Sequence, residues 1–115
     1  MEIPVLAKTI ELDNLYHIYL FYVEERWWAF GCSAYYMSIL YPELEPVFED
    51  SPQEHAECIP FLLVSERYLL KLSDFYDTLV SDAYIQISVP PTAYSYRDGY
   101  EEWCGKLSTN INSLY

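Results

Sequence analysis

The residues with the richest potential chemistry stand in the string His55-Ala56-Glu57-Cys58. A His-x-Glu arrangement can hold zinc through the histidine while the glutamate moves protons, but it also needs two thiolates from a closely spaced cysteine pair. Cys104 stands alone in Trp-Cys-Gly, so that pair is missing. We therefore interpret His55 and Glu57 as loop residues and predict no metal site and no cofactor.

Cys32 is the second candidate, because it lies between Gly31 and Ser33 just before an expected helix. Amide groups and the helix dipole at that position can lower the pKa of a thiol and make it nucleophilic, with His17 or His55 as the base. Free cysteine is among the most buried residue types, so the competing interpretation is a small core residue at a strand end. We favour packing and predict no catalytic residue.

The net charge is the strongest global signal. Eighteen acidic residues against six basic ones give a formal charge of −12. Nucleic acid and anionic membranes are themselves negative, so this balance argues against both as partners and favours a basic protein. An equally simple interpretation is that the acidity only keeps the protein soluble.

One segment concentrates that charge. Between Trp27 and Ser65 there is no Lys or Arg, and the six acids of this segment all fall within the 15 residues 43–57. An uncompensated negative field speeds the encounter with a basic partner, and tyrosines are suited to anchoring it because they bury a large area with few rotatable bonds. The residues predicted to bind a partner are Glu43, Glu45, Glu49, Asp50, Glu54, Glu57, Tyr94, Tyr96 and Tyr100.

The elements that position these residues begin with a central strand over residues 15–23, which is apolar or aromatic on both alternating faces. A turn through Glu24-Glu25-Arg26 leads to a second strand over residues 27–31. Alternation over residues 5–12 predicts an outer strand, which completes a three-stranded antiparallel meander.

The second half of the chain predicts more helix. Ser33 is expected to cap a short helix that runs to Leu40, and the acidic loop follows it. A strand over residues 60–64, a helix with an apolar stripe from Ser65 as far as Leu79, and a strand over residues 83–89 predict a strand-helix-strand unit. Asp98 and Glu101 have the spacing of a capping box and predict a C-terminal helix.

Together these patterns predict an α+β fold in which residues 1–115 form one domain: the meander, the strand-helix-strand unit and the C-terminal helix. The three cysteines show no paired spacing and no signal peptide precedes them, which favours the cytoplasm. We expect a non-enzymatic interaction module that binds or inhibits a basic, nucleic-acid-handling protein. A small enzyme or ligand-binding domain, with an aromatic pocket of Trp27 and Trp28 near Cys32, is the alternative. A homodimer that pairs its tyrosine surfaces is the third hypothesis.

Overall fold

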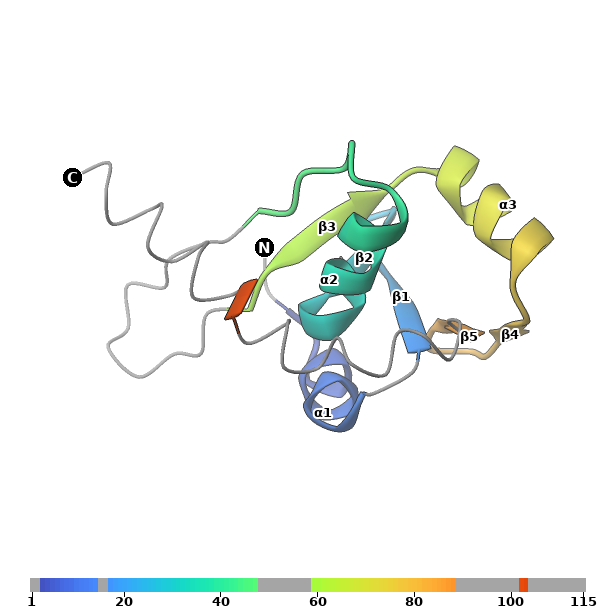
Figure 1. Ribbon diagram of the computed structural model, residues 1–115. Coiled ribbons are helices and arrows are strands. Elements are labelled where there is room, and N and C mark those ends of the chain that lie inside the picture. Colours follow the sequence, from blue (N-terminus) through green and yellow to red (C-terminus); the bar gives the residue numbers. More distant parts are fainter. Residues whose placement is uncertain (1–2, 15–16, 48–58, 89–101, 104–115) are drawn as a thin grey trace.

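The computed structural model describes residues 3–14, 17–47, 59–88 and 102–103, which form an α+β domain (Figure 1). The elements in chain order are α1 (Val5–Asp13), β1 (His17–Val23), β2 (Arg26–Phe30), α2 (Gly31–Leu40), β3 (Phe61–Val64), α3 (Glu66–Phe75), β4 (Thr78–Val80) and β5 (Ile85–Ser88).

The strands form one five-stranded sheet in the order β3-β2-β1-β5-β4, and every neighbouring pair is antiparallel. β1 therefore lies in the middle, as its two apolar faces predicted. Its residue Leu20 pairs with Ala29 of β2 on one side and with Ile85 of β5 on the other. The sequence predicted a three-stranded meander plus a strand-helix-strand unit, whereas the structure has strands of both in one five-stranded sheet, and its outer strand β4 comes from a segment that was predicted to be helical.

The hairpin between β1 and β2 is tighter than predicted. Val23 pairs with Arg26, so only Glu24 and Glu25 make the turn. Both have positive φ, 53° and 65°, as a type I′ turn requires, and this turn matches the right-handed twist of the two strands. Glycine and asparagine are the usual residues in such a turn, whereas positive φ is sterically unfavourable for glutamate.

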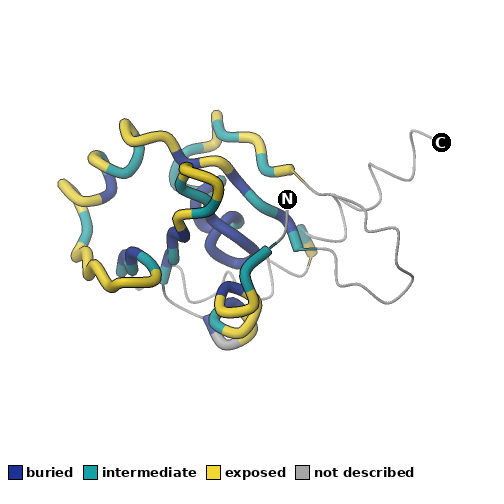
Figure 2. Tube along the Cα trace, turned by 180° about the vertical axis from the view of Figure 1, so that it is seen from behind, coloured by how far each residue is buried: buried dark blue, intermediate teal, exposed yellow. Residues whose placement is uncertain are grey.

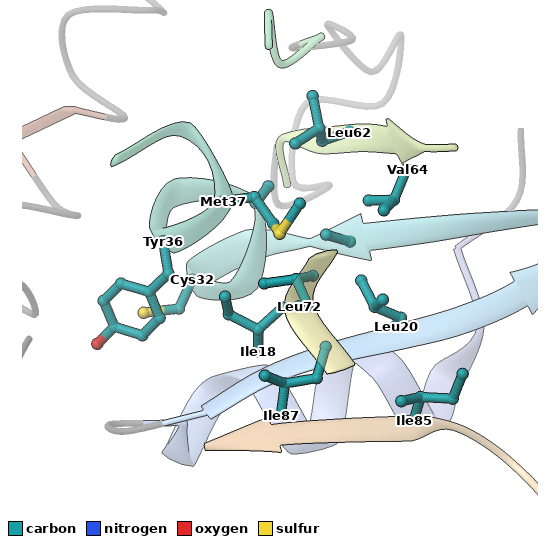
Figure 3. Packing of buried hydrophobic residues seen from close by; sticks show 12 residues of the cluster. Ile18, Leu20, Cys32, Tyr36, Met37, Leu62, Val64, Leu72, Ile85 and Ile87 are labelled. Carbon is teal, nitrogen blue, oxygen red and sulfur yellow. The ribbon is translucent and has the colours of Figure 1, made fainter. Parts of the chain in front are cut away.

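One face of the sheet is covered by α2 and α3. The side chains that fill this core come from alternate positions of the strands and from the inner faces of the two helices (Figure 3). Leu72 of α3 and Met37 of α2 have no exposed surface, and they pack against Ile18 of the central strand. Burying side chains of this size stabilises the fold by roughly 1.5–3 kcal/mol each.

The opposite face is aromatic and is covered by α1, where Ala7 packs against Phe21 and Phe30. The outer strand predicted over residues 5–12 is therefore wrong. Helical spacing places Ala7, Ile10 and Asn14 on the inner side, while Leu6 and Leu12, which a strand would place on one face together with Ile10, are 43% and 63% exposed. The predicted meander consequently lacks its first strand.

The strand-helix-strand unit is also changed. α3 ends at Phe75 instead of continuing through Leu79, and the residues beyond it form β4, which pairs with β5 as a hairpin. Ser81 closes this hairpin, because its amide donates to the carbonyl of Tyr84 at 2.9 Å. The spacing of the apolar residues could not distinguish a helix that continues to Leu79 from a shorter helix followed by a strand. In both arrangements Leu79 can lie beside Tyr76.

The predicted C-terminal helix lies outside the described residues except for Glu102 and Trp103, which are helical. Trp103 lies against Tyr35 of α2 with ring centroids 5.2 Å apart. Most of the predicted acidic loop also lies outside them. Its first part ends in an isolated bridge, in which Val47 and Phe61 exchange backbone hydrogen bonds along the outer edge of β3.

Candidate interaction surface

The acidic residues lie on the outside of the molecule. Every described Asp or Glu side chain except Glu11 is exposed. Glu43 and Glu45, the two predicted partner-binding acids that the structure describes, follow α2 on an exposed stretch. The predicted acids Glu49, Asp50, Glu54 and Glu57 and the predicted anchors Tyr94, Tyr96 and Tyr100 lie outside the described residues.

Glu43 is held by a tyrosine of α3. The hydroxyl of Tyr68 donates to Oε1 of Glu43 at 2.9 Å. The backbone amide of Glu43 and this hydroxyl lower the pKa of its carboxyl group, and the charges of Lys71 and Arg67 lower it further. The same hydrogen bond raises the pKa of Tyr68, so at neutral pH the pair consists of a carboxylate and a neutral phenol.

Aromatic rings and one cation surround this pair. Tyr41 and Tyr68 meet edge to face with ring centroids 4.9 Å apart, and the Nζ of Lys71 lies 5.9 Å and 5.2 Å from their centroids. Burial raises the pKa of Tyr41, and the neighbouring Tyr76 and Glu43 raise it further. We name Tyr41, Glu43, Tyr68 and Lys71 the tyrosine cluster.

The tyrosine cluster corrects one sequence-based expectation. No Lys or Arg stands near Glu43 in the sequence, and the segment was expected to be uncompensated. The fold brings α3 beside it, so Lys71 and Arg67 act on the Glu43 carboxylate. The local field at Glu43 is therefore weaker than the sequence implied, because helix packing supplies cations from a distant part of the chain.

A second carboxyl group, that of Glu11, is buried where α1 meets the start of α2. The Oγ of Ser33 donates to Oε1 of Glu11, and the amide of Ser33 donates to Oε2 at 3.1 Å. Asn14 donates to Oε2 at 3.1 Å and to the His17 carbonyl at 2.7 Å, and the Tyr19 amide donates to Ser33 Oγ at 2.8 Å. We name Glu11, Asn14 and Ser33 the polar junction.

The sequence analysis missed the polar junction because it placed Glu11 on a strand and Ser33 at a helix cap. The N-cap of α2 is Phe30, and Ser33 lies inside the first turn. A helical interpretation of residues 5–13 would have placed Glu11 beside Asn14, three residues apart on one face. Every buried side-chain polar atom of this group has a partner, and the junction joins α1, β1 and α2.

His17 and Tyr19 extend from the junction along the aromatic face. Their rings lie 5.7 Å apart, and Tyr19 meets Tyr84 edge to face at 5.3 Å. Burial lowers the pKa of His17. Burial raises the pKa of Tyr19, and Tyr84 and Glu11 raise it further. Burial thus favours the neutral forms of both rings.

The aromatic pocket near Cys32, on which the enzyme alternative depends, is not formed by the described residues. Cys32 has no exposed surface. Trp27 and Trp28 are successive residues of β2, so they project to opposite faces of the sheet. Trp27 instead borders a shallow hollow of about 230 Å³ with Tyr22 and Arg26, which is smaller than the roughly 300–1,000 Å³ typical of small-molecule sites.

Other kinds of site find no support in the part of the chain that the structure covers. Among those residues, no three His, Cys, Asp or Glu side chains gather as metal ligands would. The helices described are all too short or too polar to reach across a bilayer.

Comparison with known proteins adds no relative. The chain matches no protein-family model, no curated protein and no solved structure.

Proposed function

We propose that this protein is a non-enzymatic binding module for a basic protein, and that the tyrosine cluster with Glu45 is one of its contact surfaces. The observation that carries the proposal is that the ammonium group of Lys71 already lies 5.9 Å and 5.2 Å from the centroids of two tyrosine rings, and that its charge acts on the nearby Glu43 carboxylate. The cation belongs to the protein itself, and the same groups suit an arginine or lysine of a partner.

The chemistry of the tyrosine cluster favours a cation over other ligands. Aromatic ring faces attract Lys and Arg, and arginine stacks on them especially well. Glu43 is ionised and exposed, so its remaining acceptor positions can receive a guanidinium group. A partner side chain would compete with Lys71 for the rings, and Lys71 could turn to solvent at little cost because its stem is flexible.

The charge of the whole chain supports the same role. At −12 the molecule attracts cationic surfaces over a distance of about a Debye length, roughly 8–10 Å at physiological salt. Such steering raises association rates and makes them depend on salt. An inhibitor or immunity-type antagonist of a nucleic-acid-handling protein would use this attraction, since such partners carry positive surfaces.

The test is capture of partners from extracts of the host on the immobilised protein, at low and at high ionic strength. We expect basic proteins to be retained at low salt and released at high salt. Retention of acidic proteins, or retention that salt does not affect, would contradict the proposal.

A pair of matched variants separates a defined surface from diffuse charge. Glu43→Gln with Glu45→Gln removes two charges at the tyrosine cluster, and Glu24→Gln with Glu25→Gln removes two at the β1–β2 turn. All four side chains are exposed. We expect the first variant to lose affinity for the captured protein and the second to change it little. Equal losses would mean that only net charge matters and that the tyrosine cluster is not a contact surface.

A further inference from the structure

β4 forms an open edge of the sheet. It is last in the strand order and pairs only with β5 within the described residues (Figure 1). All of its residues, Thr78 to Val80, are exposed, and Figure 2 shows the chain from the end of α3 through β4 almost entirely in the colour of exposed residues. An edge of this kind is where an extended segment of another protein can add as a further strand.

The backbone groups available at this edge follow from the hydrogen bonds of the hairpin. Ser88 donates to the carbonyl of Asp77 at 3.0 Å, and Ser81 donates to the carbonyl of Tyr84 at 2.9 Å. Hydrogen-bonded positions alternate along an antiparallel strand, so positions 77, 79 and 81 face β5. The amides and carbonyls of Thr78 and Val80 therefore face outward, where hydrogen bonds to them would set the register of an incoming strand.

The opposite edge of the sheet is different. On β3 the outward groups of Phe61 are already used, because Val47 donates to and accepts from them at 2.8 and 2.9 Å. The next outward position on that edge, two residues along, is Leu63. The chain thus covers part of one edge with its own backbone, whereas β4 has no such cover among the described residues.

The side chains around β4 define what it would accept. Phe75, Leu79 and Val80 are 77%, 61% and 71% exposed. Asp74, Asp77 and Asp82 are exposed among them, and there is no Lys, Arg or His from Leu72 to Ser88. Glu43 has the cations Lys71 and Arg67 of α3 acting on it, whereas the segment that carries these aspartates contains no cation of its own.

We propose that the β4 edge binds an extended segment of the basic partner, in which apolar residues alternate and Lys or Arg flank them. Main-chain hydrogen bonds to Thr78 and Val80 would supply affinity, and the aspartates would select the charge. This inference rests on the proposed function and names a second contact surface for it. The two surfaces are neighbours at the end of α3. Tyr76 is near enough to Tyr41 to raise its pKa, and the next residue in the chain is Asp77.

A second copy of the chain is a poorer occupant. Antiparallel pairing of two β4 strands would bring together two chains that each carry a charge of −12, with Asp77 and Asp82 flanking the paired strands of both copies. Like charges close together on paired strands are destabilising. Short, charged edges are a common means of preventing self-association, and the same charges leave the edge open to a cation.

The test uses two synthetic peptides of alternating valine and threonine, one flanked by lysines and one by glutamates, with the full chain. We expect the lysine peptide to bind, to shift the amide NMR signals of Thr78 and Val80, and to bind more weakly as salt rises. The glutamate peptide should not bind. Binding of both peptides with equal affinity, or of neither, would overturn the inference.

Two proline variants locate the peptide. Val80→Pro removes an outward amide without removing a β4–β5 hydrogen bond, and Leu63→Pro does the same at the β3 edge. We expect Val80→Pro to lower affinity for the lysine peptide at least about tenfold, since one or two backbone hydrogen bonds are lost, and Leu63→Pro to leave it unchanged. The reverse result would move the site to β3.

Further measurements keep the inference testable if Val80→Pro fails to fold. Asp77→Asn with Asp82→Asn retains the backbone and should reduce both affinity and its salt dependence. Slow amide exchange at Thr78 or Val80 in the isolated protein, or a dimer by sedimentation, would show that the edge is already occupied and would overturn the inference. Retention of basic, salt-released proteins by both wild type and Val80→Pro would overturn only the β4 site, whereas loss of all salt-sensitive capture would overturn the proposed function itself.

Discussion

Glu11 and Glu43, both in the described part of the chain, each accept a hydrogen bond from a hydroxyl, and they differ in almost every other respect. Glu11 is 7% exposed and accepts from Ser33 within the polar junction. Glu43 is exposed and accepts from Tyr68 within the tyrosine cluster. Water can replace the partner of Glu43 but has little access to Glu11. We therefore expect the first bond to hold the fold together and the second to be available for exchange with a partner.

The largest effect should come from breaking the buried bond. Ser33→Ala removes the hydroxyl that donates to Glu11 and accepts from the Tyr19 amide. Leaving buried polar groups unsatisfied should lower the free energy of unfolding by about 2–3 kcal/mol. Urea denaturation measures it, with Ser38→Ala as the control because that hydroxyl only bonds the Tyr35 carbonyl within the same helix. Equal losses in the two variants would remove the distinction between the junction and an ordinary helix serine.

A smaller effect should appear in the pH dependence of stability, and its source is His17, which lies beside the polar junction. Burial lowers the pKa of His17, whose backbone amide donates to Asn14 at 3.0 Å. The unfolded chain thus takes up a proton first as pH falls below about 6.5, and stability should decrease from there down to the pKa of the folded state. Above about pH 6.5 the contribution of neutral His17 to the free energy of unfolding is fully present. In His17→Gln this part of the decrease should disappear, which thermal unfolding between neutral and mildly acidic pH can measure; an unchanged profile would assign it to other groups.

The smallest effect on stability should come from the exposed bond. Tyr68→Phe removes the hydroxyl that donates to Glu43 but keeps the ring against Tyr41 and Lys71. We expect the unfolding midpoint to change little and the pKa of Glu43 to rise toward its ordinary value, because this hydroxyl is the second cause of its lowering after the backbone amide. Carbon-detected NMR titration of the carboxyl group measures the pKa. A loss of stability as large as that of Ser33→Ala would mean that the tyrosine cluster is structural.

Several elements followed directly from the sequence. The two-sided apolar pattern predicted that β1 is central, and the charged residues after it predicted the hairpin. The sequence could not predict the type of turn, because Glu24 and Glu25 carry none of the usual signals of a type I′ turn. α1 was missed because its buried side includes Glu11 and ends at the buried C-cap Asn14, and a polar residue on the inner face disrupts the apolar pattern from which a helix is recognised.

The surroundings of the candidate surface could be predicted only in part. Glu43 and Glu45 are exposed, but the tyrosines near Glu43 are Tyr41 and Tyr68, and Tyr68 comes from a helix that the sequence assigned to packing. The open edge at β4 had no sequence signal, since its residues resembled the last turn of α3.

The sequence by itself determined the negative charge, the apolar content and the central strand, because these depend on composition and on periodicity along one segment. Only the tertiary structure decided which acids are compensated, which carboxyl group is buried and which strand is left at the edge. Each of these depends on groups that are far apart in the chain, such as Lys71 and Glu43 or Ser33 and Glu11, and their meeting is set by how the helices pack on the sheet.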